Sequence, residues 1–156
     1  MASAQAPDCI PAPDIRVRAA AIGDASDVAL LLDALGYPCS RDEAAERIAV
    51  ILGDPRHHLL LAEIGGRACG LAAMDLRYSL TRGADQARIT ALVVKPDCGR
   101  RGVGRRLLRE VEGIARRMRV ARIEVTSNPR RGEAHAFYHD CGYADGSRHF
   151  FKLLGD

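Results

Sequence analysis

Three glycines and four arginines lie within one short segment, between an apolar run and a long amphipathic pattern. Glycine lets a ligand approach the main chain closely, and arginine pairs with phosphate oxygens. The N–H groups of a first helical turn and the helix dipole favour an anion at the same place. The segment is therefore a candidate phosphate-binding loop. Its candidate residues are Gly99, Arg100, Arg101, Gly102, Val103, Gly104 and Arg105.

Other phosphate-binding motifs do not match this loop. A Walker loop ends in Gly-Lys-Ser/Thr, which does not follow here. A dinucleotide-binding fingerprint needs G-x-G-x-x-G close to the start of its fold, whereas this loop lies beyond residue 90. On the loop alone, a solvent-exposed turn before a basic helix remains the alternative.

The histidines and cysteines do not form a metal-binding pattern. His135 and His139 are one helical turn apart, but no glutamate lies between them as in H-E-x-x-H, so solvated or capping histidines are expected. The five cysteines are widely spaced without C-x-x-C, which argues against zinc and a disulfide framework and is typical of a reducing cytoplasm. Cys98 is interpreted as a small filler residue. No metal is expected.

The elements that must position the loop follow from hydrophobic periodicity. Asp24 and Ser40 are expected N-caps, with Glu43 completing a capping box, and Gly70 is expected to mark a β-bulge. Strands are predicted over 15–19, 57–64, 67–80, 87–95, 121–126, 143–144 and 149–154. Helices are predicted over 24–35, 40–52, 103–118 and 133–141.

The order β-α-α-β-β-β-α-β-α-β-β predicts an α/β fold (α+β in some schemes), a mixed sheet with helices on both faces. With 156 residues, one domain is expected over 14–156, after a flexible tail at 1–13. The net charge of +3 and the absence of tryptophan argue against nucleic-acid binding. No segment is long enough to span a membrane, and no signal peptide is evident.

Two segments resemble GNAT-superfamily N-acetyltransferases, and the resemblance runs from about Ile15 to Leu154. Residues 92–108, L-V-V-K-P-D-C-G-R-R-G-V-G-R-R-L-L, are similar to the acyl-CoA pyrophosphate loop of that family. Residues 126–143, T-S-N-P-R-R-G-E-A-H-A-F-Y-H-D-C-G-Y, are similar to its A-x-x-F-Y-x-x-x-G-F/Y element. With the tail R-H-F-F-K-L-L, the second segment is most similar to aminoalkylphosphonate N-acetyltransferases.

The resemblance implies the acyl-CoA N-acyltransferase fold, with a mostly antiparallel sheet of six to seven strands splayed between strands four and five. It implies acetyl-CoA as co-substrate and direct acetyl transfer to a primary amine of a small molecule. The pantetheine arm is expected along the strand edge at Leu92, Val93 and Val94, and a main-chain N–H of Val93 or Val94 is expected to polarise the acetyl carbonyl.

The resemblance also assigns roles near the C-terminus. Tyr138 is expected to protonate the departing thiolate, the alternative being a core aromatic beside Phe137. Asn128 is expected to bond the pantetheine amide, the alternative being a strand-end turn. Phe137 and Tyr138 complete the expected cofactor-binding residues.

The chain departs from the family pattern at three places. The family loop is Q/R-x-x-G-x-G/A, and its first position holds Gly99 while the usual glycine position holds Arg100. The central-strand glutamate that serves many members as base is replaced by Thr90 and Ala91. Asp75 is therefore a candidate to order a water near the amine, the alternative being a solvent-facing residue. The His-rich segment of phosphonate enzymes corresponds to Ser-Leu-Thr-Arg over 79–82.

Other functions remain open at this stage. The missing glutamate is also typical of a non-catalytic acyl-CoA-binding or regulatory module, and a protein N-terminal or lysine acetyltransferase would share the same motifs. Expected partners are acetyl-CoA and a small amine, without nucleic acid or membrane, in a cytoplasmic protein for which a homodimer is the expected assembly. Acidic and basic residues both surround the first two helices, so the charge of the amine substrate is not decided.

Overall fold

The computed structural model describes residues 14–99, 102–126, 132–146 and 149–155. The sheet order is β1-β2-β3-β4-β5, antiparallel throughout except for the parallel β4–β5 pair. Strands are β1 (Ile15–Ala19), β2 (His57–Ile64), β3 (Arg67–Ser79), β4 (Ala84–Val94) and β5 (Ile123–Val125). Helices are α1 (Ala25–Leu35), α2 (Arg41–Leu52), α3 (Val103–Arg117) and α4 (Gly132–Asp140), with short 3-10 turns η1 (Ile22–Asp24) and η2 (Pro96–Cys98).

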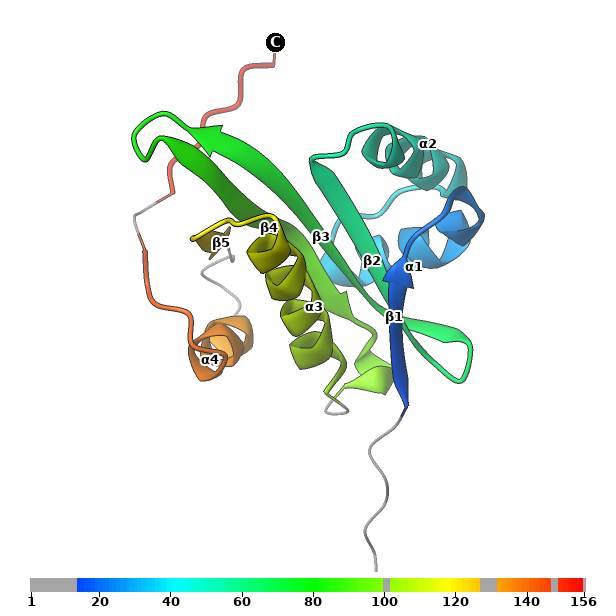
Figure 1. Ribbon diagram of the computed structural model, residues 1–156. Coiled ribbons are helices and arrows are strands. Elements are labelled where there is room, and N and C mark those ends of the chain that lie inside the picture. The colour runs from blue at the N-terminus through cyan, green and yellow to red at the C-terminus, as the bar shows by residue number, and fades with distance from the viewer. Residues whose placement is uncertain (1–13, 100–101, 127–131, 147–148, 156) are drawn as a thin grey trace, which may run out of the picture.

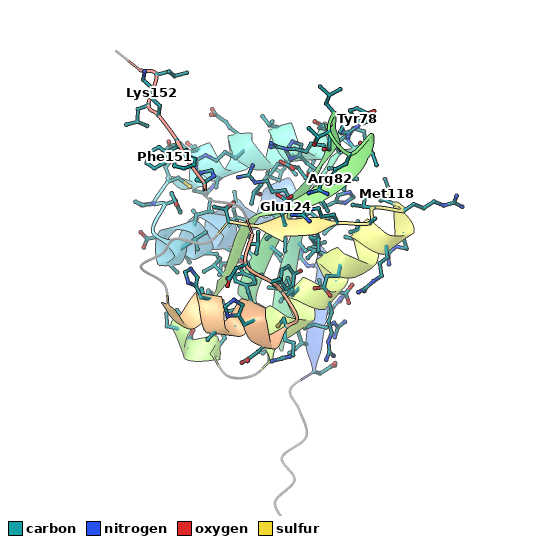
Figure 2. All side chains as sticks on the ribbon, turned by 90° about the vertical axis from the view of Figure 1, so that its left-hand side faces the viewer. Tyr78, Arg82, Met118, Glu124, Phe151 and Lys152 are labelled. Atoms are coloured by element: carbon teal, nitrogen blue, oxygen red, sulfur yellow. The ribbon has the colours of Figure 1, made fainter. Side chains whose placement is uncertain are left out.

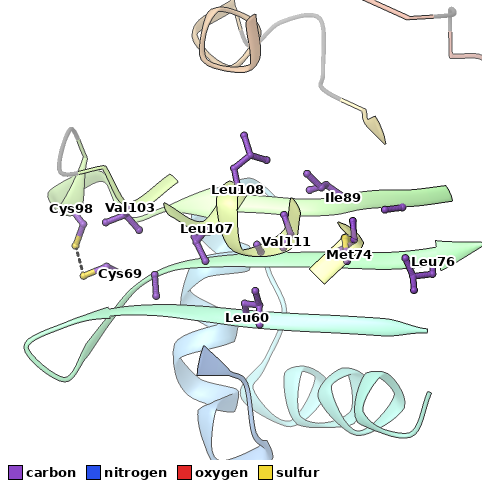
Figure 3. Close-up of a cluster of buried hydrophobic side chains, with 14 residues drawn as sticks. Leu60, Cys69, Met74, Leu76, Ile89, Cys98, Val103, Leu107, Leu108 and Val111 are labelled. Carbon is purple, nitrogen blue, oxygen red and sulfur yellow. Dashed lines mark hydrogen bonds between the residues drawn. The ribbon is translucent and has the colours of Figure 1, made fainter. Parts of the chain in front are cut away.

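The helices cover both faces of the sheet, as predicted. Figure 1 shows α1 and α2 behind the sheet and α3 with α4 on the opposite side. Each face has its own buried cluster. In one cluster, Leu31 of α1 and Ile48 of α2 pack against Leu61 of β2. The other cluster lies between α3 and the opposite face of the sheet. Figure 3 shows this second cluster, in which Leu107 and Val111 of α3 are fully buried against the sheet.

The expected six to seven strands are wrong for the described residues, which form five. Segments 143–144 and 149–154, expected as a closing hairpin, contain no strand among their described residues. The side chains of Phe150, Phe151, Leu153 and Leu154 are 81–86% exposed, and Figure 2 shows Phe151 standing clear of the sheet. Apolar alternation indicates a preference for a pleated surface, but it does not supply a strand to pair with.

The helix starts agree with the predicted caps, with one difference in mechanism. The Ser40 hydroxyl accepts from the Glu43 N–H at 3.0 Å, and the Glu43 carboxylate accepts from the Ser40 N–H at 3.0 Å. Asp24 precedes α1 as predicted, but its carboxylate accepts from the Ala21 N–H at 2.7 Å and from the Arg18 guanidinium at 2.8 Å. The pKa of Asp24 is lowered, chiefly by the Arg18 hydrogen bond.

Two β-bulges shape the sheet. Ala62 pairs with Gly70 whereas Glu63 pairs with Ala68, so Cys69 is the extra residue on β3, next to the predicted Gly70. On β4 the extra residue is Thr90, because Ala73 pairs with Ala91 and Met74 pairs with Ile89. A bulge bends its strand and redirects side chains. Among the described residues, none of the helices is long and apolar enough to cross a membrane.

Candidate active site

The sheet opens between β4 and β5 at the β4 bulge. Strand β5 pairs with β4 at Ala87, Arg88 and Ile89. From Thr90 to Val94, β4 continues to pair with β3, and no described strand lies along its other edge. The bulge at Thr90 starts where the β5 pairing ends, so the bend separates the two strands. This opening lies at the expected position between the fourth and fifth strands.

A cavity of about 110 Å³ lies in this opening. Its walls come from segments that are distant in sequence. They are the bulged part of β4 (Ile89, Thr90, Ala91, Leu92), the end of β5 and the residue after it (Val125, Thr126), α4 (Ala134, Tyr138), and the end of α1 and the turn that follows (Leu35, Tyr37). The structure thus brings the predicted Leu92 and Tyr138 to one place. Sequence reasoning missed Leu35 and Thr126, since nothing in their spacing marks them.

Along residues 90–95, the main-chain N–H and C=O groups point alternately toward β3 and toward the opening. The Lys95 N–H donates to the Cys69 carbonyl at 2.8 Å. Because hydrogen-bonded pairs alternate along an antiparallel ladder, Val93 also directs its main-chain groups toward β3. Leu92 and Val94 therefore direct theirs toward the opening. Of the two expected carbonyl-polarising donors, this alternation favours Val94 over Val93.

The first turn of α3 offers main-chain donors. Gly102 has a φ of 81° and precedes the helix. The described residues provide no hydrogen-bond acceptor for the N–H groups of Val103, Gly104 and Arg105, and the Arg106 N–H donates to the Gly102 carbonyl at 2.9 Å. The first-turn N–H groups of a helix are available to an anion for this reason. The Gly99 N–H, by contrast, donates to the Pro96 carbonyl at 3.3 Å.

Two glycines allow α3 to approach the sheet and α4. A Cβ on Gly70 would lie 2.9 Å from Val103 Cγ1 and 3.0 Å from the Val93 carbonyl oxygen. A Cβ on Gly104 would lie 3.4 Å from the Phe137 ring, so Phe137 closes over the first turn of α3. The sequence analysis predicted a bulge at Gly70 but not that the missing side chain of this glycine makes room for α3.

The arginines of this helix differ in their partners. Arg106 donates to the Glu110 carboxylate and to the Ile15 carbonyl, each at 3.0 Å, so its guanidinium is engaged within the protein. Arg105 is exposed on the first turn and is free to approach an anion from solvent. Three predicted ligand-binding residues, Arg100, Arg101 and Asn128, lie outside the described residues.

Tyr138 is held by neighbouring aromatic rings. Its ring centroid lies 5.3 Å from that of Phe137 and 5.6 Å from that of Tyr143. The Tyr143 N–H donates to the Tyr138 carbonyl at 2.9 Å, and the Tyr143 hydroxyl donates to the Glu112 carboxylate at 2.8 Å. Burial first, then the Glu112 hydrogen bond, raise the pKa of Tyr143 well above its usual range. This contact fastens the end of α4 to α3, and sequence reasoning missed it because the two residues are distant in the chain.

Asp75 lies on β3, where it pairs with His57 on one side and Arg88 on the other. Its Oδ1 is buried and has no hydrogen-bond partner among the described residues, although the Arg77 Nε lies 3.9 Å away. Asp75 does not line the cavity. Its neighbour across the sheet, Arg88, directly precedes Ile89 of the cavity wall, so Asp75 lies close to the opening without reaching it.

His139 and Glu43 have structural partners. His139 Nε2 lies 2.9 Å from Asp145 Oδ1, outside any cluster of ligands. Within the part of the chain that the structure describes, no three His, Cys, Asp or Glu side chains lie close enough to hold a metal ion. The Glu43 carboxylate is engaged in the capping box, and the main-chain hydrogen bond from Ser40 is the largest cause of its lowered pKa.

Comparisons with known proteins agree with this arrangement. The model of the acetyltransferase (GNAT) family matches residues 28–143. The chain is 30% identical over 125 residues to an aminoalkylphosphonate N-acetyltransferase of Salmonella typhimurium, covering 80% of this chain and 79% of the relative.

Solved structures share the fold. A GNAT family acetyltransferase of Staphylococcus aureus matches with a TM-score of 0.76 at 26% identity, over 90% of this chain and 98% of that one. A glucosamine-6-phosphate N-acetyltransferase of Arabidopsis thaliana matches with a TM-score of 0.77 at 16% identity, over 90% and 99% of the two chains. The family match, the relative and the opened sheet lead to one conclusion: the chain belongs to the GNAT family and is an acetyltransferase.

Proposed function

We propose that the protein transfers an acetyl group from acetyl-CoA directly to the primary amine of a small molecule. One observation carries this proposal. The cavity beside the free half of β4 (residues 90–94) is lined by Tyr138. The first-turn N–H groups of α3, which have no acceptor among the described residues, lie just beyond the same half of the strand. The opening therefore combines a strand edge, an anion-binding helix start and a phenol.

The phosphates of the co-substrate fit the first turn of α3. The N–H groups of Val103, Gly104 and Arg105 are the donors, with Arg105 adding positive charge. Gly104 keeps this turn clear of a side chain, and Gly102 supplies the left-handed conformation before it. Arg100 and Arg101 are proposed to add to this site from the same loop.

The pantetheine arm fits the free edge of β4. Leu92 and Val94 direct their main-chain groups toward the opening, and an extended amide-bearing chain adds to such an edge as a further strand would. Phe137 and Asn128 are proposed to contact this arm. The Val94 N–H is proposed to donate to the acetyl carbonyl oxygen, where negative charge develops during transfer.

The proton steps are assigned to side chains near the cavity. Acetyl-CoA, when bound, supplies the acetyl group as an activated thioester. The Tyr138 Oη is proposed to give its proton to the departing sulfur. Among the described residues, no carboxylate lines the cavity, so Asp75 is proposed to accept the amine proton through a water.

The amine class is supported by the relatives. The Salmonella relative is named for an aminoalkylphosphonate and the Arabidopsis structure for glucosamine-6-phosphate, both small amines. The described side chains that line the cavity are apolar or uncharged. A domain at 14–156, a cytoplasmic location and a homodimer stay predictions from the sequence.

The test combines two measurements on the same preparation. Calorimetry with acetyl-CoA measures binding, and release of free thiol measures transfer to a panel containing aminoalkylphosphonates, amino sugar phosphates, polyamines and lysine peptides. Binding together with amine-dependent thiol release supports the proposal. Release with the peptides alone favours the second candidate, a protein acetyltransferase, and binding without release from any amine of the panel contradicts the proposal. Failure to bind acetyl-CoA overturns both candidate functions.

A further inference from the structure

Two thiols meet beside the phosphate loop. Cys98 Sγ lies 2.9 Å from Cys69 Sγ, and Figure 3 shows the two side chains directed toward one another. Cys69 is 4% exposed and Cys98 is 8% exposed. Cys69 is the extra residue of the β3 bulge, and Cys98 is the last residue of η2. The bulge therefore directs the Cys69 side chain toward the turn that leads into the loop.

The main chain holds the pair together independently of the sulfurs. The Lys95 N–H donates to the Cys69 carbonyl at 2.8 Å, and the Cys98 N–H donates to the Lys95 carbonyl at 2.9 Å. The main chains of both cysteines are thus hydrogen-bonded to Lys95. A disulfide has an S–S distance of about 2.0 Å, so closure moves the sulfurs by about 0.9 Å. Side-chain rotation supplies this much without unfolding the strand.

Solvent-borne reagents can reach the pair. A cavity of about 120 Å³ is lined by both thiols together with Arg67, Lys95 and Asp97. One molecule of liquid water takes up roughly 30 Å³, so the cavity has room for a small hydroperoxide beside the sulfurs. The described residues offer no third metal ligand at this place.

We propose that Cys69 and Cys98 are a redox modification site that closes to a reversible disulfide under a hydroperoxide. One thiolate attacks the peroxide oxygen, which gives a sulfenic acid and water (or an alcohol). The second thiol attacks the sulfenic sulfur, the S–S bond forms and a second water leaves. Two electrons and two protons pass from the thiols to the peroxide, and a dithiol reductant reverses the reaction.

The reaction is slow at neutral pH. Burial, followed by the hydrogen bond with Cys69, raises the pKa of Cys98 to about 11. The attacking species is the thiolate, so few molecules are reactive at any moment. The pair accordingly stays reduced under ordinary conditions and closes under sustained oxidation.

Closure also acts on the neighbouring loop, a consequence that rests on the proposed function. Cys98 directly precedes Gly99 and the turn into α3. A covalent link to β3 pulls η2 toward the strand and holds the start of the phosphate loop there. The oxidised protein is therefore expected to bind CoA at least several-fold more weakly than the reduced protein.

The experiment uses the full chain, reduced and then treated with hydrogen peroxide, with remaining thiols alkylated before peptide mass mapping. The expected result is a peptide pair joined through Cys69 and Cys98 that dithiothreitol separates. Cys69→Ser and Cys98→Ser should each lack it, whereas Cys39→Ser and Cys141→Ser should retain it. The proposal would be overturned if both Cys69 and Cys98 were alkylated after peroxide treatment, or if only Cys39 and Cys141 were oxidised.

Calorimetry with CoA on the oxidised and reduced forms tests the effect on the loop. Equal affinity of the two forms overturns the coupling to the loop. If neither form binds CoA, the proposed function fails, while the mass mapping still decides whether the disulfide forms.

Discussion

The two halves of strand β4 differ in what lies beside them. At residues 87–89 the strand has β3 on one side and β5 on the other. Ala87 is 0% exposed and Ile89 is 2% exposed. From Thr90 to Val94 the strand has β3 alone among the described strands, and Thr90 is exposed. One apolar run thus has a partner strand on both edges at one end and on one edge at the other, where we propose that the co-substrate binds. The bulge changes main-chain pairing rather than burial, because Val93 of the free half is still only 8% exposed.

The helices strengthen the same contrast. The cluster under α3 includes Ala87 and Ile89 of the paired half, whereas the first turn of α3 lies against the free half, where Gly70 lets Val103 approach. Substitutions near the paired half should therefore reduce stability, and substitutions near the free half should reduce activity or binding.

The largest effect is expected at the paired half. Leu76 on β3 pairs with Ala87 and is 5% exposed, so Leu76→Ala leaves a cavity in the core. We expect the free energy of unfolding to fall by about 3 kcal/mol, measured by urea denaturation. Leu80→Ala, at a side chain that is 88% exposed, is the matched control and should change stability little. Equal losses in the two variants would contradict the comparison.

At the free half, Tyr138→Phe removes the proposed proton donor and keeps the ring. We expect turnover to fall about 100-fold, with the Kd for CoA within twofold of the wild type, measured by thiol release and calorimetry. Tyr78→Phe, on a tyrosine 63% exposed near the far end of β3, controls for loss of a hydroxyl. Wild-type turnover in Tyr138→Phe would remove the role proposed for this residue.

The loop contains a matched pair of glycines. Gly102 has a φ of 81°, where a side chain is strained, whereas Gly99 has a φ of −64° and an added Cβ would lie 3.4 Å from the Pro96 carbonyl. Gly102→Ala is expected to cost about 1–2 kcal/mol and to weaken CoA binding several-fold. Gly99→Ala should be close to wild type in both measurements, thermal unfolding and calorimetry. The reverse order would show that the left-handed turn is not needed.

The smallest effect is expected at the contact that fastens α4. Tyr143→Phe removes the hydrogen bond to Glu112 and should cost about 1 kcal/mol, with a modest fall in turnover because Tyr138 is less firmly held. The raised pKa of Tyr143 means that the unfolded chain releases this proton first, near pH 10. Wild-type stability should therefore decline above that pH, and its advantage over the variant should shrink. A constant difference across pH 8–11 would argue against the hydrogen bond.

Much of the fold was predictable because its signals are local. Ser40 and Glu43 stand at capping-box spacing, and the box forms as predicted. The apolar repeat of α3 gave its bounds within one residue, and Gly36 and Gly142 end their helices in the left-handed region. The predicted closing hairpin at 149–154 was wrong for the described residues because its apolar pattern does not specify a partner strand.

The candidate site was predicted in part. Motif similarity singled out the loop and Tyr138, whose roles stay predictions, whereas Thr126, Leu35 and the Tyr143–Glu112 contact carry no such signal. Cys98 was interpreted as filler, yet its sulfur faces Cys69. These features join residues that are far apart in sequence, so no periodicity within one segment reveals them.

Local signals in the sequence predicted the helices, the strands that pair in the sheet and the position of the proposed phosphate loop, because caps, glycines and hydrophobic periods act over a few residues. The tertiary structure decided which half of β4 lacks a neighbour, why β3 needs Gly70 and which two thiols meet. Those outcomes depend on packing and strand register between distant segments, and a single bulged residue changes the register.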